Sequence, residues 1–195
     1  MHAQKINLLT ENDPAPYTVH KGNSPVLFTG PHNGHAVPEA LPACMDTEKE
    51  WFNNAHEAVD LYVAELFEVL QSKMNDASFL AGNYSRLVYD LNAKPDFAIR
   101  TCSCENDKRI IPANLPENCT LDDRQRRMSE IYTPYHDAKH DLINEIRNNH
   151  NNEILVLDLH SFTPTWQGQL RNVEIGTIRS EETELSIAFE NYLRA

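Results

Sequence analysis

Polar side chains that can bind a metal or move a proton follow a short apolar segment late in the sequence. Residues 154–159 are rich in branched apolar residues, and Asp158, His160 and Ser161 lie at the end of this run. Such a run predicts a strand buried on both faces in the middle of a parallel sheet. Ligands bind outside the carboxyl ends of such strands, so His160 is a candidate metal ligand or base that Asp158 could orient. The alternative is a loop histidine capped by its neighbours.

A second histidine occupies an equivalent place earlier in the chain. Residues 26–29 read Val-Leu-Phe-Thr, which predicts a short buried strand. The next residues, Gly-Pro-His-Asn-Gly-His, predict a tight loop that places His32 just past the strand. Two imidazoles, those of His32 and His160, are therefore expected at strand ends.

A third polar pair lies on the helix expected after this loop. Thr47 and Glu50 have the spacing of a capping box, which predicts a long helix that begins near Thr47. His56 and Asp60 are one helical turn apart at the edge of its apolar stripe, and they are either a surface pair or half of a site. The residues expected in the buried stripe are Phe52, Ala55, Val59, Tyr62, Leu66 and Leu70.

A second long helix is expected over residues 122–149. Pro134 should break or kink it just before His136. Three arginines near its start either form surface ion pairs at helical spacing or recognise a substrate carboxylate. These are Arg124, Arg126 and Arg127, and the expected buried stripe is Ile131, Tyr135, Ala138, Leu142 and Ile146.

The order of the remaining elements indicates the fold class. Residues 1–24 read as a loosely packed N-terminal lead-in, and 93–120 as a long covering loop. Strands are expected at 77–81, 86–92 and 173–178, and a last helix at 181–193. Alternating strands and helices predict one three-layer α/β domain over 24–195, with right-handed crossovers.

Charge and cysteine content restrict the partners and the compartment. The 195 residues carry a formal net charge of −12, which argues against nucleic acid and anionic membranes as partners. No apolar run reaches the length of a membrane span, and the N-terminus lacks a signal-peptide core. The four cysteines are expected to be reduced thiols of a cytoplasmic protein, unless Cys102, Cys104 and Cys119 share a metal.

The motifs taken together, in this order, resemble one known family. They are Pro31-His32-x-Gly34-x-x-x-Pro38, His56-x-Ala58-x-Asp60, Tyr84 to Asn92, Arg127, Pro134-Tyr135-His136, His160 to Pro164, and a strand with Gly176. This ordered set, over about residues 24–195, resembles the N-formylglutamate amidohydrolase family. The resemblance implies a fold similar to that of the zinc carboxypeptidases, with a mixed, mostly parallel sheet between helices.

The resemblance also implies an activity and a set of site residues. The activity is zinc-dependent hydrolysis of the amide of N-formylglutamate or a related small anionic N-acyl amino acid. His32 and His160 are the implied histidine ligands, and Asp60 is the carboxylate ligand, with His56 as the alternative. Three protein ligands leave one position of a catalytic zinc for water. The residues assigned to catalysis are Arg86, Asp158 and His136, and those assigned to substrate binding are Arg86, Asn92, Arg127 and Ser161.

Two departures from the family pattern leave other functions open. The family continues Asp-x-Asn with arginine, whereas Ala93 follows Asn92 here. The family also runs on through a segment with a glutamate near the metal, and this sequence ends before such a segment. We expect either a truncated or minimal version that turns over slowly, or another group in that role, with Asp158 or His136 as the base. The alternatives are a zinc-binding protein with little turnover, and a hydrolase that resembles a carboxypeptidase or a peptidoglycan amidase.

Overall fold

The computed structural model describes residues 8–39, 59–99, 104–105, 108–109, 121–162, 164–166, 169–172, 175–178 and 183–194. The chain forms two compact units, Met1–Phe162 and Thr163–Ala195. All of the candidate site residues that the structure describes belong to the first unit.

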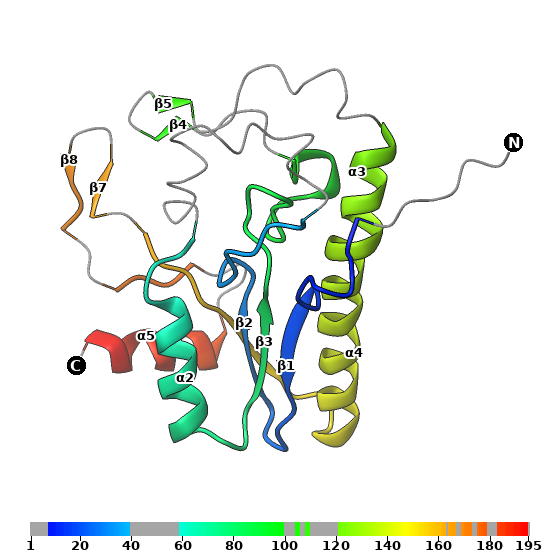
Figure 1. Ribbon diagram of the computed structural model, residues 1–195. Helices are drawn as coiled ribbons and strands as arrows, with labels where there is room; N and C mark the ends of the chain where they lie inside the picture. The colour runs from blue at the N-terminus through cyan, green and yellow to red at the C-terminus, as the bar shows by residue number, and fades with distance from the viewer. Residues whose placement is uncertain are drawn as a thin grey trace, which may run out of the picture. The chain divides into compact units, whose positions relative to one another are not determined.

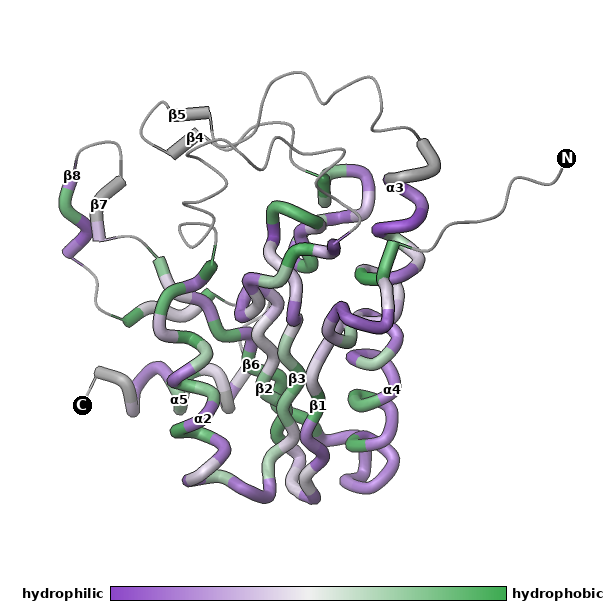
Figure 2. Tube along the Cα trace, in the orientation of Figure 1, coloured by the Kyte–Doolittle hydropathy of each residue, from purple (hydrophilic) through white to green (hydrophobic). Residues whose placement is uncertain are grey.

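The first unit is built on a four-stranded sheet with the order β1-β3-β2-β6. The central strands β3 (Ser78–Gly82) and β2 (Val26–Gly30) are parallel, and β6 (Leu155–Asp158) is parallel to β2. The strand β1 (Tyr17–His20) runs antiparallel to β3. Apolar residues fill the middle of the sheet (Figure 2), where Leu27 and Leu80 are fully buried. The mixed, mostly parallel sheet predicted from the sequence is confirmed.

Helices cover both faces of this sheet (Figure 1). The helix α2 (Val63–Lys73) packs Val63 and Phe67 against Phe28 and Phe79 on one face. The other face meets a π-helical turn (Met128–Tyr132) and α4 (Thr133–Asn149), which continue the helix that begins with α3 (Leu121–Arg127). The long helix predicted over 122–149 is confirmed. The expected interruption at Pro134 takes the form of this π-helical turn, which runs without a break into α4, and Pro134, which has no N–H to donate, lies in the first turn of α4.

Of the helix predicted from Thr47 to Leu70, the described residues form a helix only from Val63 onward, as α2. Tyr62, the residue before α2, has φ 66°, which is left-handed and ends any regular helix there. The predicted stripe is also out of phase, because Tyr62 is 78% exposed and Leu66 is exposed, whereas Val63 and Phe67 are buried. Asp60 therefore lies in a turn and not on a helix. His56 and Thr47 lie outside the described residues.

The strand predicted at 86–92 is wrong, because these residues form turns. The N–H groups of Val88 and Tyr89 both donate to the Ser85 carbonyl, and the Asp90 N–H donates to the Ala98 carbonyl. This backbone is satisfied locally and needs no neighbouring strand. The apolar residues between 86 and 92 are buried in the core, and Asp90 is buried in a polar site. This burial, and not pairing in a sheet, accounts for the strand-like pattern of the sequence.

Three further predictions differ from the structure. Within the described sheet β6 is an edge strand with half-buried residues, because it pairs only with β2, whereas a central strand was expected. The lead-in expected over 1–24 contributes β1 to the sheet and the buried Leu8 to the core. The strand expected at 173–178 is not formed in its described part, residues 175–178.

The other described elements are short, apart from one helix. A 3-10 turn lies at Pro95–Phe97, and β4 (Cys104–Glu105) pairs with β5 (Lys108–Arg109). In the second unit β7 (Thr165–Trp166) and β8 (Gln169–Leu170) form a hairpin. The helix α5 (Glu184–Arg194) confirms the helix predicted over 181–193. Across the described residues, no helix combines the length and the apolar character needed to cross a membrane.

Candidate metal centre

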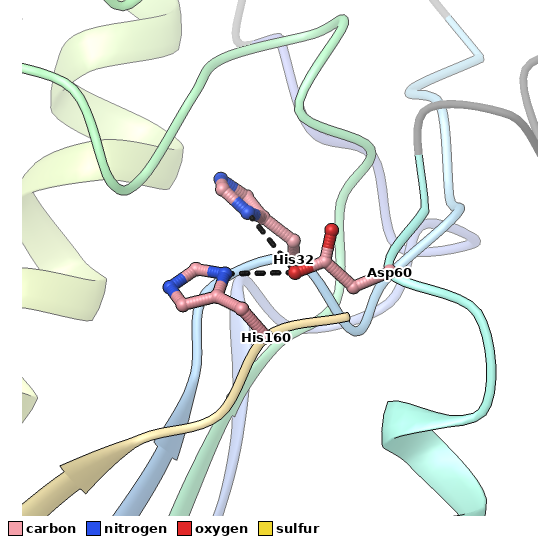
Figure 3. Close-up of side chains that lie close together, drawn as sticks. All are labelled: His32, Asp60 and His160. Carbon is pink, nitrogen blue, oxygen red and sulfur yellow. Dashed lines mark hydrogen bonds and ion pairs between the residues drawn. The ribbon is translucent and has the colours of Figure 1, made fainter. Parts of the chain in front are cut away.

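Two histidines and one aspartate converge at the carboxyl edge of the sheet (Figure 3). His32 lies two residues after β2, and His160 lies two residues after β6. Because β2 and β6 are parallel neighbours, their ends deliver both imidazoles to the same edge. Asp60 comes from the turn before α2, and its N–H donates to the His32 carbonyl over 3.2 Å. Three distant segments of the chain thus meet at one point.

The geometry of this cluster suits a metal ion. His160 Nδ1 lies 2.7 Å from Asp60 Oδ2, and His32 Nδ1 lies 3.5 Å from the same oxygen. One ligand atom from each of the three residues lies within 4.8 Å of the others. Two imidazole nitrogens and one carboxylate oxygen are the donor set of a three-ligand catalytic zinc site. His32, Asp60 and His160 could therefore hold a metal ion.

A buried carboxylate fixes the orientation of His32. Asp90 is 1% exposed, and His32 Nε2 donates to Asp90 Oδ1 over 2.7 Å. Arg86 donates to His32 Nδ1 over 2.5 Å, so Nδ1 carries the lone pair and Nε2 the proton. Metal-binding histidines typically donate their second N–H to a carboxylate in this way. The tautomer of His32 thus leaves the lone pair of Nδ1, the atom that could bind a metal, on the side of the ring that faces Arg86 and Asp60.

The charges of the cluster are mutually stabilised. Burial raises the pKa of Asp60, but the hydrogen bond from His160, the contact with the His32 ring and the charge of Arg86 outweigh burial and hold this pKa well below its usual range. Burial lowers the pKa of His32, but its contacts with Asp60 and Asp90 outweigh burial and raise this pKa. Asp60 is therefore anionic at neutral pH, and protons compete with a metal for His32 as the pH falls.

Arg86 and Asn92 also lie at this centre. The Arg86 guanidinium donates to Asp60 Oδ1 and to His32 Nδ1. Its loop is anchored by the Ser85 N–H, which donates to the Ala36 carbonyl over 2.9 Å. The Asn92 side-chain amide lies 3.5 Å from His160 Nε2. The structure thus brings His32, Asp60, His160, Arg86 and Asn92 together.

Other residues predicted for the site make contacts elsewhere. Asp158 accepts from Lys139, at 2.9 Å to Oδ1 and 3.2 Å to Oδ2, so a lysine engages both of its oxygens. Arg127 is 1% exposed and donates to the Val88 carbonyl over 3.1 Å, which holds the turns around Arg86. Ser161 is half-buried directly after His160.

His136 is oriented by the backbone. Its Nε2 donates to the Leu91 carbonyl over 3.0 Å, and its ring packs against Tyr132. Burial lowers the pKa of His136, so the ring is neutral at neutral pH, with its lone pair on Nδ1.

Two contacts of the site were not predicted from the sequence. The pairing of Asp90 with His32 was missed, although Asp90 stands in the Asp-x-Asn motif beside Arg86. The pairing of Lys139 with Asp158 was also missed. Its only signal was a lysine four residues after Tyr135 and three before Leu142, within the buried stripe of the second long helix.

Comparison with known proteins finds relatives of one family. The family model of N-formylglutamate amidohydrolase matches residues 24–195. An N-formylglutamate deformylase of Pseudomonas putida is 25% identical over 186 residues, which is 87% of this chain and 65% of that protein. An N-formylglutamate deformylase of Pseudomonas aeruginosa is 28% identical over 123 residues, which is 60% of this chain and 44% of that protein. The chain therefore spans less than two thirds of these two curated relatives.

Solved structures show the same fold. The crystal structure of a gene product of Agrobacterium tumefaciens matches with a TM-score of 0.81 and 26% identity, covering 96% of this chain and 73% of that one. The N-formylglutamate amidohydrolase of Ralstonia eutropha matches with a TM-score of 0.56 and 20% identity, covering 76% of this chain and 58% of that one, and supports the fold alone. Because the family model covers most of the sequence, this chain belongs to the N-formylglutamate amidohydrolase family.

Proposed function

We propose that this chain hydrolyses the amide of N-formylglutamate, or of a related small N-acyl amino acid, with a zinc ion held by His32, Asp60 and His160. Water adds to the formyl carbon, the C–N bond breaks, and formate and the free amino acid are released. The observation that supports the proposal is the set of three ligand atoms within 4.8 Å of one another, beside Arg86, in a chain of this family.

Each residue of the centre has a distinct part in this reaction. His32, Asp60 and His160 would hold the zinc ion, which would supply polarisation of the amide carbonyl and a lower pKa of the attacking water. Arg86 presents a fork of N–H donors next to Asp60, suited to a developing oxyanion or a substrate carboxylate. His136 is a better proton acceptor than Asp158, because its neutral ring has a lone pair on Nδ1, whereas Lys139 binds both oxygens of Asp158.

The direct test is formate release by the purified protein from N-formylglutamate, after dialysis against a chelator and again after addition of zinc. We expect release only with zinc, and a bound zinc ion by elemental analysis. Zinc binding without formate release would show that the chain binds the metal but lacks this activity. Release from peptides but not from N-acyl amino acids would identify a peptide hydrolase instead.

Asp90→Asn should weaken zinc binding by roughly 10- to 100-fold, the usual cost of changing a carboxylate behind a metal-binding histidine. The neutral amide is a weaker acceptor for His32 Nε2–H and makes Nδ1 less basic. Competition with a fluorescent chelator measures the affinity. Asp13→Asn is the control, since Asp13 accepts hydrogen bonds from Thr10 and from the Glu39 N–H, none of which contacts the ligands. Equal affinities in Asp90→Asn and the parent would contradict the assignment.

A further inference from the structure

We propose that Lys139 binds a second carboxylate of the substrate and thereby sets the preference of this site for dicarboxylic N-acyl amino acids. The inference rests on the proposed function, because it concerns the ligand of the same site. It starts from a lysine placed on the side of α4 that packs on the sheet.

Lys139 lies among core residues of α4. It is four residues after Tyr135 and three before Leu142, both buried against the sheet, so it shares their face of the helix. A lysine on this face loses part of its hydration, which costs free energy, whereas a lysine on the solvent-facing side of α4 would keep its hydration. The structure compensates this loss with Asp158, whose two oxygens lie 2.9 and 3.2 Å from Lys139 Nζ. The side chain keeps 21% of its surface exposed, so a ligand can reach it.

This ion pair lies at the same edge of the sheet as the metal ligands. Asp158 is the last residue of β6, two residues before His160. Its register partner Thr29 is three residues before His32, and Lys139 Nζ lies 3.5 Å from Thr29 Oγ1. Two residues of extended chain span about 6.6 Å. The five bonds from the formyl carbon of N-formylglutamate to its side-chain carboxyl carbon span about 6 Å. A substrate at the metal ligands is thus long enough to approach Lys139.

The charges at this edge favour the same assignment. N-formylglutamate carries two carboxylates, and Arg86 can bind one of them. Among the basic residues described near this edge, Arg127 is 1% exposed and held by the Val88 carbonyl, and Arg124 donates to the Asp96 carbonyl. Lys139 has three donors, and its contact with Thr29 is at the limit of hydrogen-bond length. One donor of Lys139 is thus available for a substrate carboxylate.

The test measures binding, so that it does not depend on turnover. Calorimetric titration of the zinc-loaded full chain with L-glutamate and with L-glutamine compares two ligands that differ only in the distal carboxylate. We expect glutamate to bind roughly 10- to 100-fold more tightly, the effect of one charged hydrogen bond. Lys139→Met keeps an unbranched side chain of similar length without the charge and should remove this preference, while Lys139→Arg should retain part of it.

Two controls separate carboxylate recognition from other effects. The double variant Lys139→Met with Asp158→Asn should also lack the preference. This result would exclude the explanation that Lys139→Met weakens glutamate binding only because the unpaired Asp158 repels the ligand. Lys21→Met breaks the exposed ion pair between Lys21 and Glu145, also on α4, and should leave the preference unchanged. A preference that survives in Lys139→Met, or one that the parent lacks, overturns the inference. If the protein releases no formate but its preference for glutamate depends on Lys139, the proposed reaction is refuted and the inference about Lys139 stands.

Discussion

His32→Ala, Asp60→Ala and His160→Ala should each lose the bound zinc ion and at least about 10³-fold of the rate of formate release. The rate estimate follows because a metal supplies several kcal/mol of transition-state stabilisation and each 1.4 kcal/mol is tenfold. Each residue provides one of three ligand atoms, and two ligands hold an open zinc site poorly. Elemental analysis after purification without chelator measures the metal, and a coupled assay measures formate.

His20→Ala is the matched control for these variants. His20 ends β1 and pairs with Phe79 near the start of β3, so it lies at the opposite edge of the sheet, where its ring nitrogen bonds the Asn75 carbonyl. It should keep both the zinc and the rate. Unchanged metal in His32→Ala and His160→Ala would refute the ligand assignment. We also expect Asp60→Ala to lose more metal than His56→Ala, and the reverse result would make His56 the third ligand.

Arg86→Ala should lower the rate of formate release by about 10²- to 10³-fold, the usual cost of removing a donor aimed at a developing oxyanion. Arg86→Lys keeps the charge but loses the planar fork, so it should also be impaired. The reason is geometric, since Arg86 bridges Asp60 and His32 in the structure, and an ammonium presents its donors differently. Steady-state kinetics on N-formylglutamate, together with the metal content, separates a loss of rate from a loss of zinc.

Arg124→Lys is the control for the arginine variants. Arg124 donates to the backbone carbonyls of Pro95 and Asp96 and should tolerate the exchange without a change of rate. If Arg86→Lys hydrolyses N-formylglutamate as fast as the parent, the fork of the guanidinium is not used. If Arg86→Ala does so as well, Arg86 does not belong to the site.

Local sequence patterns were sufficient for most of the framework and for two residues of the site. Compact apolar runs correctly predicted β2 and β3, and a 3.6-residue period correctly predicted the long helix that ends at Asn149. A histidine just past the end of a parallel strand must lie at the carboxyl edge of the sheet. That rule alone is enough to place His32 and His160 at the same edge.

The partners of those histidines depended on the tertiary structure. Asp60 reaches the site from a turn, because the left-handed Tyr62 separates it from α2, whereas its helical spacing with His56 predicts a place on a helix. Asp90 and Lys139 come from segments 58 and 19 residues away from their partners His32 and Asp158. Periodicity reports which side of one segment is buried, and it carries no information about which distant polar group meets it. Strand register and turn geometry decide that, and they are properties of the folded chain.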